Sequence, residues 1–222
     1  MKRAAAARAV AEVETGMVLG LGSGSTAAMA VELLAERVAA GLRIVGIPTS
    51  ERTATLARKL GVPLTSFAEH RRLDLTIDGA DQVQRETLTL IKGGGGALLR
   101  EKIVAAASTR MIAVVDATKL VDQLGGGFPL PVEIVQFGWQ SVIDRLMALG
   151  LNPRLRLTGE RPFVTDGGNH IADCAIAALS DPETLSAELS EIVGVVETGL
   201  FIGLASEVVV GGPDGVEILK RR

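Results

Sequence analysis

Short apolar segments alternate with segments of helical periodicity through the first half of this 222-residue chain, and this alternation constrains the fold most. The predicted strands of this half span residues 17–21, 42–47, 73–77, 87–91 and 111–115. The predicted helices span residues 2–14, 27–40, 51–60 and 97–107. Strands that alternate with helices indicate an α/β domain, with a mostly parallel sheet covered by helices on both faces.

A different pattern follows the segment 125–131, whose glycines and prolines are typical of a domain boundary. The order there is strand, helix, two strands, helix and strand, which is the split βαβ, ferredoxin-like arrangement. These elements are predicted at 132–136, 139–149, 154–158, 163–165, 182–192 and 194–197. The apolar segment 200–210 is expected to return to the first sheet, so the sequence predicts two domains.

Polar clusters follow the predicted strands of the first half, each at the point where a strand ends. In parallel sheets of this kind, ligands bind beyond the carboxyl ends of the strands. We therefore expect the clusters to form one site. They are Ser23 to Thr26, Thr49 and Ser50, Asp78 and Asp81, Lys92, and Lys119.

Lys92 opens a run of four glycines, the glycine loop (residues 93–96). Glycine loses more conformational freedom on folding than any other residue, so such a run is costly. It is typical of places where the backbone passes close to a ligand, most often an anion held by bare N–H groups. A lysine directly before this loop is well placed for an oxyanion or a phosphate, although surface lysines are common.

The hydroxyl loop (residues 22–26) joins a predicted strand to a predicted helix. Its glycines do not have the spacing of a dinucleotide fingerprint, and no acidic residue ends the second strand, which closes with Pro48. It also lacks the Gly-Lys-Ser/Thr of a P-loop. Hydroxyls and free N–H groups at a helix N-terminus suit a monophosphate. The alternative is an ordinary helix cap by Ser23 or Ser25.

Three acidic residues are candidates for proton transfer. Asp78 and Asp81 bracket a tight turn, so they can bind sugar hydroxyls or move protons, or serve only the turn. Glu101 follows the glycine loop early in a helix, where a glutamate also matches the helix dipole. A metal role is not indicated, because His70 and His170 do not fall at metal-ligand spacing.

Composition narrows the function classes. The formal net charge of −3 gives no indication of binding to nucleic acid or to an acidic membrane surface, and no apolar run reaches the roughly 18 residues of a membrane span. The single cysteine, Cys174, cannot form an internal disulfide, which fits a reducing cytoplasm, and it is expected to be a small buried residue. The basic ends, including Lys2 and Arg3, are interpreted as solvated termini.

Several motifs together carry a resemblance to a known family. In chain order they are Gly22-Ser23-Gly24-Ser25-Thr26, Pro48-Thr49-Ser50, Asp78-Gly79-Ala80-Asp81, Lys92-Gly93-Gly94-Gly95, Arg100-Glu101-Lys102, Asp116-Ala117-Thr118-Lys119, Phe128-Pro129-Leu130-Pro131-Val132-Glu133 and Thr165-Asp166-Gly167-Gly168-Asn169. With this order and spacing, the chain resembles the type A ribose-5-phosphate isomerases over nearly its whole length. Ser23 stands where threonine is usual, and Gly96 replaces an alanine.

The resemblance implies interconversion of D-ribose 5-phosphate and D-ribulose 5-phosphate through an enediol, in the non-oxidative pentose phosphate pathway, without a metal or an organic cofactor. It implies Glu101 as the general base, with Asp78, Asp81 and Lys92 as the other catalytic residues. The implied substrate-binding residues are Ser23, Gly24, Ser25, Thr26, Gly79, Ala80, Gly93, Gly94, Gly95 and Lys119.

The resemblance also implies an architecture and an assembly. A Rossmann-like catalytic domain is expected from residues 1–127 and 200–222, and a ferredoxin-like small domain from residues 128–199. A cytoplasmic homodimer or homotetramer is expected. Two other classes share features with the chain: sugar-phosphate sensor domains of transcriptional regulators, which carry an additional helix-turn-helix, and acyl-CoA transferases, which use a catalytic glutamate but are longer.

Overall fold

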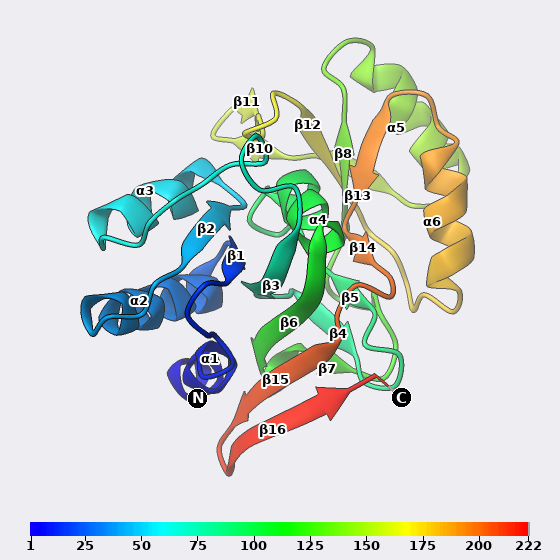
Figure 1. Ribbon diagram of the computed structural model, residues 1–222. Helices are drawn as coiled ribbons and strands as arrows, with labels where there is room; N and C mark the ends of the chain where they lie inside the picture. Colours follow the sequence, from blue (N-terminus) through cyan, green and yellow to red (C-terminus); the bar gives the residue numbers. More distant parts are fainter. Residues whose placement is uncertain (222) are drawn as a thin grey trace.

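A six-stranded sheet forms the centre of the molecule in the computed structural model, which describes residues 1–221 (Figure 1). The strand order is β16-β15-β6-β3-β1-β2, and every neighbouring pair is parallel except β15 and β16. The strands are β1 Val18–Leu21, β2 Val45–Pro48, β3 Leu73–Asp78, β6 Ser108–Asp116, β15 Glu207–Gly212 and β16 Gly215–Lys220. The predicted parallel sheet is confirmed. Segment 200–210 returns to it only from Glu207 onward, because Leu200 and Phe201 pair in another sheet. The hairpin partner β16 was not predicted.

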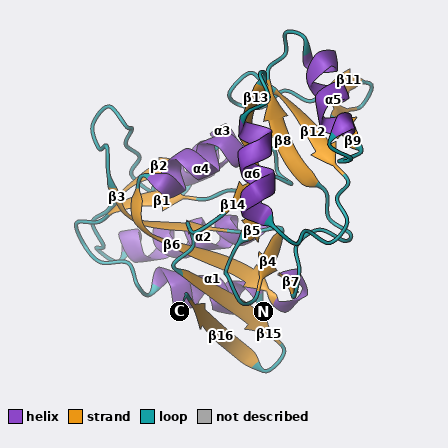
Figure 2. Ribbon diagram, turned by 90° about the vertical axis from the view of Figure 1, so that its right-hand side faces the viewer, coloured by secondary structure: helices purple, strands orange, loops and turns teal. Residues whose placement is uncertain are grey.

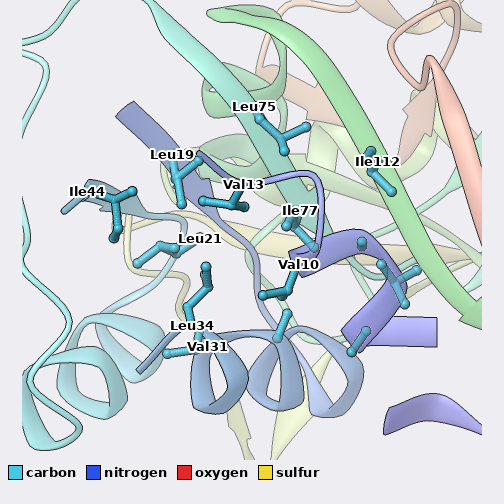
Figure 3. Close-up of a cluster of buried hydrophobic side chains, with 14 of the residues drawn as sticks. Val10, Val13, Leu19, Leu21, Val31, Leu34, Ile44, Leu75, Ile77 and Ile112 are labelled. Carbon is cyan, nitrogen blue, oxygen red and sulfur yellow. The ribbon is translucent and has the colours of Figure 1, made fainter. Parts of the chain in front are cut away.

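Helices cover both faces of this sheet (Figure 2). They are α1 Lys2–Val10, α2 Ser25–Ala39, α3 Glu51–Lys59 and α4 Leu98–Ala106. On one face, α1 and α2 enclose a core of aliphatic side chains that includes Leu19, Leu34 and Leu75 (Figure 3). On the other face lies α4, whose Val104 packs so closely on Gly20 of β1 that a Cβ there would lie 2.5 Å from its side chain. The first helix is shorter than the predicted 2–14.

A second, small sheet lies beside the first and was not predicted. It has the order β14-β5-β4-β7, and its strands are β4 Gln82–Gln84, β5 Leu90–Ile91, β7 Leu120–Val121 and β14 Leu200–Phe201. Segment 87–91 was expected to belong to the parallel sheet, which is wrong, because β5 pairs antiparallel with β4 and β14. A parallel neighbour requires a crossover of a dozen or more residues, usually a helix, and the connection after Asp78 holds only the strand β4.

The ferredoxin-like arrangement is present in the third sheet, of order β13-β8-β12-β9 with every neighbouring pair antiparallel. Its strands are β8 Leu130–Ile134, β9 Pro153–Leu155, β12 His170–Cys174 and β13 Val195–Thr198. Helices α5 Trp139–Ala148 and α6 Pro182–Ser190 share one apolar core with this sheet.

One strand of this region was predicted at the wrong place. Residues 163–165 are not a strand. A hairpin of β10 Leu157–Thr158 and β11 Arg161–Pro162 precedes them, and the third strand of the ferredoxin-like arrangement is β12. The domain limits at 127/128 and 199/200 stay a prediction. Within residues 1–221, no helix has the length and apolar character needed to cross a membrane.

Candidate active site

The hydroxyl loop joins β1 to α2 and rests directly on Asp78. A Cβ at Gly22 would overlap the Asp78 side chain, and the Ser23 N–H donates to Asp78 Oδ1 at 2.9 Å. Helix α2 begins after Gly24, which has φ +91° and no side chain to cap the helix, so the predicted alternative of a cap by Ser23 or Ser25 is wrong. An uncapped helix N-terminus leaves N–H groups and a positive dipole end for an anion.

The Ser23 hydroxyl is occupied by contacts within the protein and is not available for a ligand. Its Oγ lies 2.8 Å from Thr49 Oγ1, 2.8 Å from Ser50 Oγ and 3.1 Å from Thr53 Oγ1. These contacts use the hydrogen-bonding capacity of a hydroxyl group, which has one donor and two lone pairs. Ser23 therefore faces the cavity with its backbone, and Ser25 and Thr26 are the loop residues whose hydroxyls are available there.

Asp78, Lys92 and Glu101 form a buried charged triad. Lys92 Nζ lies 3.0 Å from Asp78 Oδ2 and 3.3 Å from Glu101 Oε1, and it donates to the Gly79 carbonyl at 2.6 Å. Asp78 Oδ1 also accepts from the N–H groups of Ser23 and Gly79. Asp78 thus combines the predicted turn contact with an ion pair to Lys92.

Glu101 is a buried carboxyl group that lines the cavity, an arrangement that can serve as a general base. It is 5% exposed, and its Oε2 is buried with no hydrogen-bond partner among residues 1–221. Burial raises the pKa of Glu101 to about 8, because desolvation outweighs the attraction of Lys92, and the nearby Asp78 carboxylate adds to the increase. This carboxyl group is not one that merely complements the helix dipole at the surface.

The other two members of the triad are shifted as well. Burial raises the pKa of Asp78, against the opposing charge of Lys92. Burial alone would lower the pKa of Lys92, but the carboxylates of Asp78 and Glu101 outweigh it and raise the pKa above its ordinary value. Lys92 therefore keeps its positive charge beside Oε1 of Glu101, and Oε2 is the oxygen without a partner among residues 1–221.

Asp81 contacts the glycine loop directly. Its Oδ2 accepts from the Gly94 N–H at 2.7 Å. Gly93 and Gly96 have φ values of +103° and +79°, a region that favours glycine, and a Cβ on Gly96 would lie 2.5 Å from the ring of Phe163. The loop therefore requires glycine for both its conformation and its close packing.

One cavity of about 160 Å³ collects these groups. All of the predicted site residues line it except Asp78 and Gly94, which contact the lining residues Lys92 and Asp81, respectively. The lining residues are Lys2, Ser23, Gly24, Ser25, Thr26, Gly79, Ala80, Asp81, Lys92, Gly93, Gly95, Glu101 and Lys119.

Lys2 is a lining residue that the sequence does not predict, because a basic residue near a chain end is typical of a solvated terminus. Helix α1 packs across β6 and β15 and so brings Lys2 beside the carboxyl end of β6, where Lys2 Nζ lies 3.4 Å from Asp116 Oδ2. No local signal in the sequence points to this, because it depends on tertiary packing of α1.

Residues outside the cavity have structural contacts. Asp166 accepts from the Glu51 N–H at the start of α3, and the His170 ring lies 2.9 Å from the Phe163 carbonyl. Cys174 is fully buried, as expected, and burial raises the pKa of its thiol to about 12. Within residues 1–221, no three His, Cys, Asp or Glu side chains are grouped so as to hold a metal ion.

Known proteins match this chain over most or all of its length. The family model described as ribose 5-phosphate isomerase A (phosphoriboisomerase A) matches residues 45–215. The ribose-5-phosphate isomerase A of Gloeobacter violaceus is 58% identical over 219 residues, which is 99% of this chain and 95% of that protein.

Solved structures agree over the same length. The ribose 5-phosphate isomerase A of Methanocaldococcus jannaschii has a TM-score of 0.95 and 40% identity, covering 99% of this chain and 98% of that one. A D-ribose-5-phosphate isomerase in complex with phospho-erythronic acid has a TM-score of 0.95 and 38% identity, covering 99% and 97%. The chain belongs to the ribose 5-phosphate isomerase A family.

Proposed function

We propose that the protein interconverts D-ribose 5-phosphate and D-ribulose 5-phosphate, with Glu101 as the general base. The observation that carries this proposal is the buried Glu101 carboxyl group. Its Oε1 lies 3.3 Å from Lys92 Nζ, and its Oε2 has no hydrogen-bond partner among residues 1–221. The cavity that it lines also holds an uncapped helix N-terminus. Relatives that cover nearly the whole chain are named as this enzyme, and the complex with phospho-erythronic acid is that of a relative with a phosphorylated sugar acid.

The phosphate end of the substrate is assigned to the hydroxyl loop. The N–H groups at the start of α2 and the hydroxyls of Ser25 and Thr26 supply donors, and Lys2 and Lys119 supply positive charge on the same cavity. Binding energy from this non-reacting end orients the sugar against Glu101.

The isomerisation moves one proton between neighbouring carbons and one between their oxygens. In the forward direction, Glu101 removes the proton from C2 of the open-chain aldose and returns it to C1, so that one carboxylate serves both carbons. The intermediate carries developing negative charge on oxygen, and Lys92 with the glycine-loop N–H groups provides donors for it.

The two aspartates then have different roles. Asp81 lines the cavity and is assigned to ring opening and to proton movement between the sugar oxygens. Asp78 is fully buried and does not line the cavity, so its part is to hold Lys92 and the hydroxyl loop in place.

The wider setting is part of the proposal. The reaction belongs to the non-oxidative pentose phosphate pathway and requires neither a metal nor an organic cofactor. A cytoplasmic location is supported by the single unpaired, buried cysteine. The homodimer or homotetramer that the family resemblance implies stays a prediction.

Glu101→Gln is expected to lower turnover by about 10²- to 10⁴-fold while sugar-phosphate binding stays nearly unchanged, because the amide keeps the shape but cannot take a proton. Ribulose 5-phosphate formation is measured with EDTA present, and ribose 5-phosphate binding by calorimetry, with Glu36→Gln as the surface control. If the wild type binds the sugar phosphate without turnover, the proposed enzyme activity is contradicted and a sensor is favoured. If Glu101→Gln loses binding and turnover equally, Glu101 has a structural role.

The pH profile of kcat/KM is expected to rise through about pH 8. A general base must be deprotonated, and the raised pKa of Glu101 means that its carboxylate form is lost as the pH falls below about 8. The profile of kcat/KM reports the ionisation of the free enzyme, so it is measured between pH 5.5 and 9.5. A profile that is already flat from pH 6 upward contradicts the assignment.

Lys2→Met is expected to raise KM for ribose 5-phosphate about tenfold and to lower kcat less, because it removes one charged donor from a partly exposed phosphate site. Arg3→Met is the matched control, since Arg3 pairs with Glu32 and Glu36 on α2 and does not line the cavity. Equal KM values for the two variants and the wild type exclude Lys2 from substrate binding.

Glu101→Gln is also expected to stabilise the protein, increasingly so from about pH 4.5 to 8. In that range the folded protein holds a proton on Glu101 that the unfolded chain releases, so the stability of the wild type falls as pH rises, by at most about 1.4 kcal/mol per pH unit. Melting temperatures of both proteins are compared across pH 4.5–9. If the difference in melting temperature between the two proteins does not change with pH, the pKa of Glu101 is not raised.

A further inference from the structure

An arginine of the ferredoxin-like region donates hydrogen bonds to the carbonyls of the glycine loop. Arg156 lies between β9 and β10, and its Nη1 donates to the carbonyls of Gly93 at 2.9 Å and Gly94 at 3.2 Å. The same guanidinium binds Asp173 of β12 through two further bonds, Nε to Oδ2 at 2.8 Å and Nη2 to Oδ1 at 2.5 Å. This bidentate pair fixes the plane of the guanidinium.

Arg156 is mostly buried and makes these contacts within a packed environment. Its side chain is 16% exposed, and its guanidinium carbon lies 5.9 Å from the centre of the Phe163 ring, which also packs against Gly96. A guanidinium held by a carboxylate and an aromatic ring loses little additional freedom when it binds the loop. Arg156, Phe163 and Asp173 therefore form a rigid support for the loop.

The two carbonyl contacts determine where the loop points its N–H groups. In a planar trans peptide, the N–H lies opposite the carbonyl of the same unit, and the chain contains no cis peptide bond among residues 1–221. Because the Gly93 and Gly94 carbonyls face Arg156, the N–H groups of Gly94 and Gly95 face away from it. The Gly94 N–H is indeed bonded to Asp81.

The Gly95 N–H remains for the substrate. Gly95 lines the cavity together with Lys92 and Glu101, and its N–H makes no hydrogen bond with any of residues 1–221. Such a donor stabilises charge in a transition state only if its direction is fixed before the reaction. Its orientation here depends on the Arg156 contact to the carbonyl of the same peptide.

We infer that Arg156 is a positioning residue for the isomerisation, which fixes the glycine-loop peptides so that the Gly95 N–H meets the developing enediolate oxygen. The inference rests on the proposed isomerase function. The small domain thereby contributes to catalysis through the backbone of the large domain, without touching the substrate.

The test compares Arg156→Met and Arg156→Lys with the wild type in two measurements. One is kcat/KM for ribose 5-phosphate, and the other is the inhibition constant of phospho-erythronic acid, whose carboxylate places negative charge at the reacting end of a sugar phosphate. Arg156→Met is expected to lower kcat/KM about 10- to 100-fold, less than the roughly 10²- to 10³-fold loss on removing an oxyanion donor outright. The inhibition constant is expected to rise by a similar factor, and Arg156→Lys, which keeps one donor, is expected to lie between.

Arg100→Met is the matched control. Arg100 also links the two domains, donating to the Asp166 carbonyl at 3.0 Å and pairing with Glu51, but it does not contact the glycine loop. Its kcat/KM and inhibition constant are expected to stay within twofold of the wild type.

Three results overturn the inference. The first is a kcat/KM and an inhibition constant of Arg156→Met that both stay within twofold of the wild type. The second is a fall in kcat with an unchanged inhibition constant, which indicates only less folded enzyme, and the third is the same loss in Arg100→Met. If Arg156→Met does not fold, Arg156→Lys decides, and parallel changes of threefold or more in both constants support the inference while unchanged constants overturn it. Failure of the proposed function is separate, because it appears as an inactive wild type.

Discussion

The ion pair of Lys92 with two buried carboxylates is the interaction on which the site depends. Removing an ammonium group from water costs several kcal/mol, which a buried lysine recovers only through close partners with good geometry. Asp78 comes from the end of β3, Glu101 from the first turn of α4, and Lys92 from the end of β5. Each element must therefore hold its position for the charge to be tolerated.

The second sheet explains how Lys92 reaches this place. Strand β5 pairs with β4 and β14, and the Lys92 N–H donates to the Gly199 carbonyl, so the backbone at Lys92 is fixed on both sides of the residue. Its ammonium also lies 5.5 Å from the centre of the Phe201 ring. A short mixed sheet, in which β5 pairs antiparallel with both of its neighbours, thus places a charge that the parallel sheet alone does not supply.

Asp78 joins the two ends of the cavity. One of its oxygens accepts from the Ser23 N–H in the hydroxyl loop, and the other pairs with Lys92. Gly22 permits this approach, because any side chain there would occupy the space of the carboxylate. The hydroxyl loop and Lys92 are consequently held at a fixed separation by one fully buried residue.

The sequence predicted those parts of the site that follow from strand ends and local motifs. The hydroxyl loop, Asp78 and Lys119 are predicted in one site because parallel strands end at one edge, and this logic holds for β1, β3 and β6. Lys92 was placed there by the same logic, but it reaches the site from β5 of the small sheet. Lys2 and Arg156 were not predicted, because each reaches the site through tertiary packing, and an isolated basic residue in the sequence is most often solvated. The inward turn of the Ser23 hydroxyl likewise depends on Thr49, Ser50 and Thr53, which lie on another segment.

The raised pKa of Glu101 reflects a compromise between base strength and the fraction of base that is ionised. A carboxylate of ordinary pKa would be fully ionised at neutral pH but would be a weak base toward a carbon-bound proton. Burial strengthens the base, and the charge of Lys92 limits the shift, so that an ionised fraction is retained near neutral pH. In the proposed mechanism the same lysine provides a donor for the enediolate oxygen, so the group that moderates the base also lowers the energy of the intermediate that the base creates.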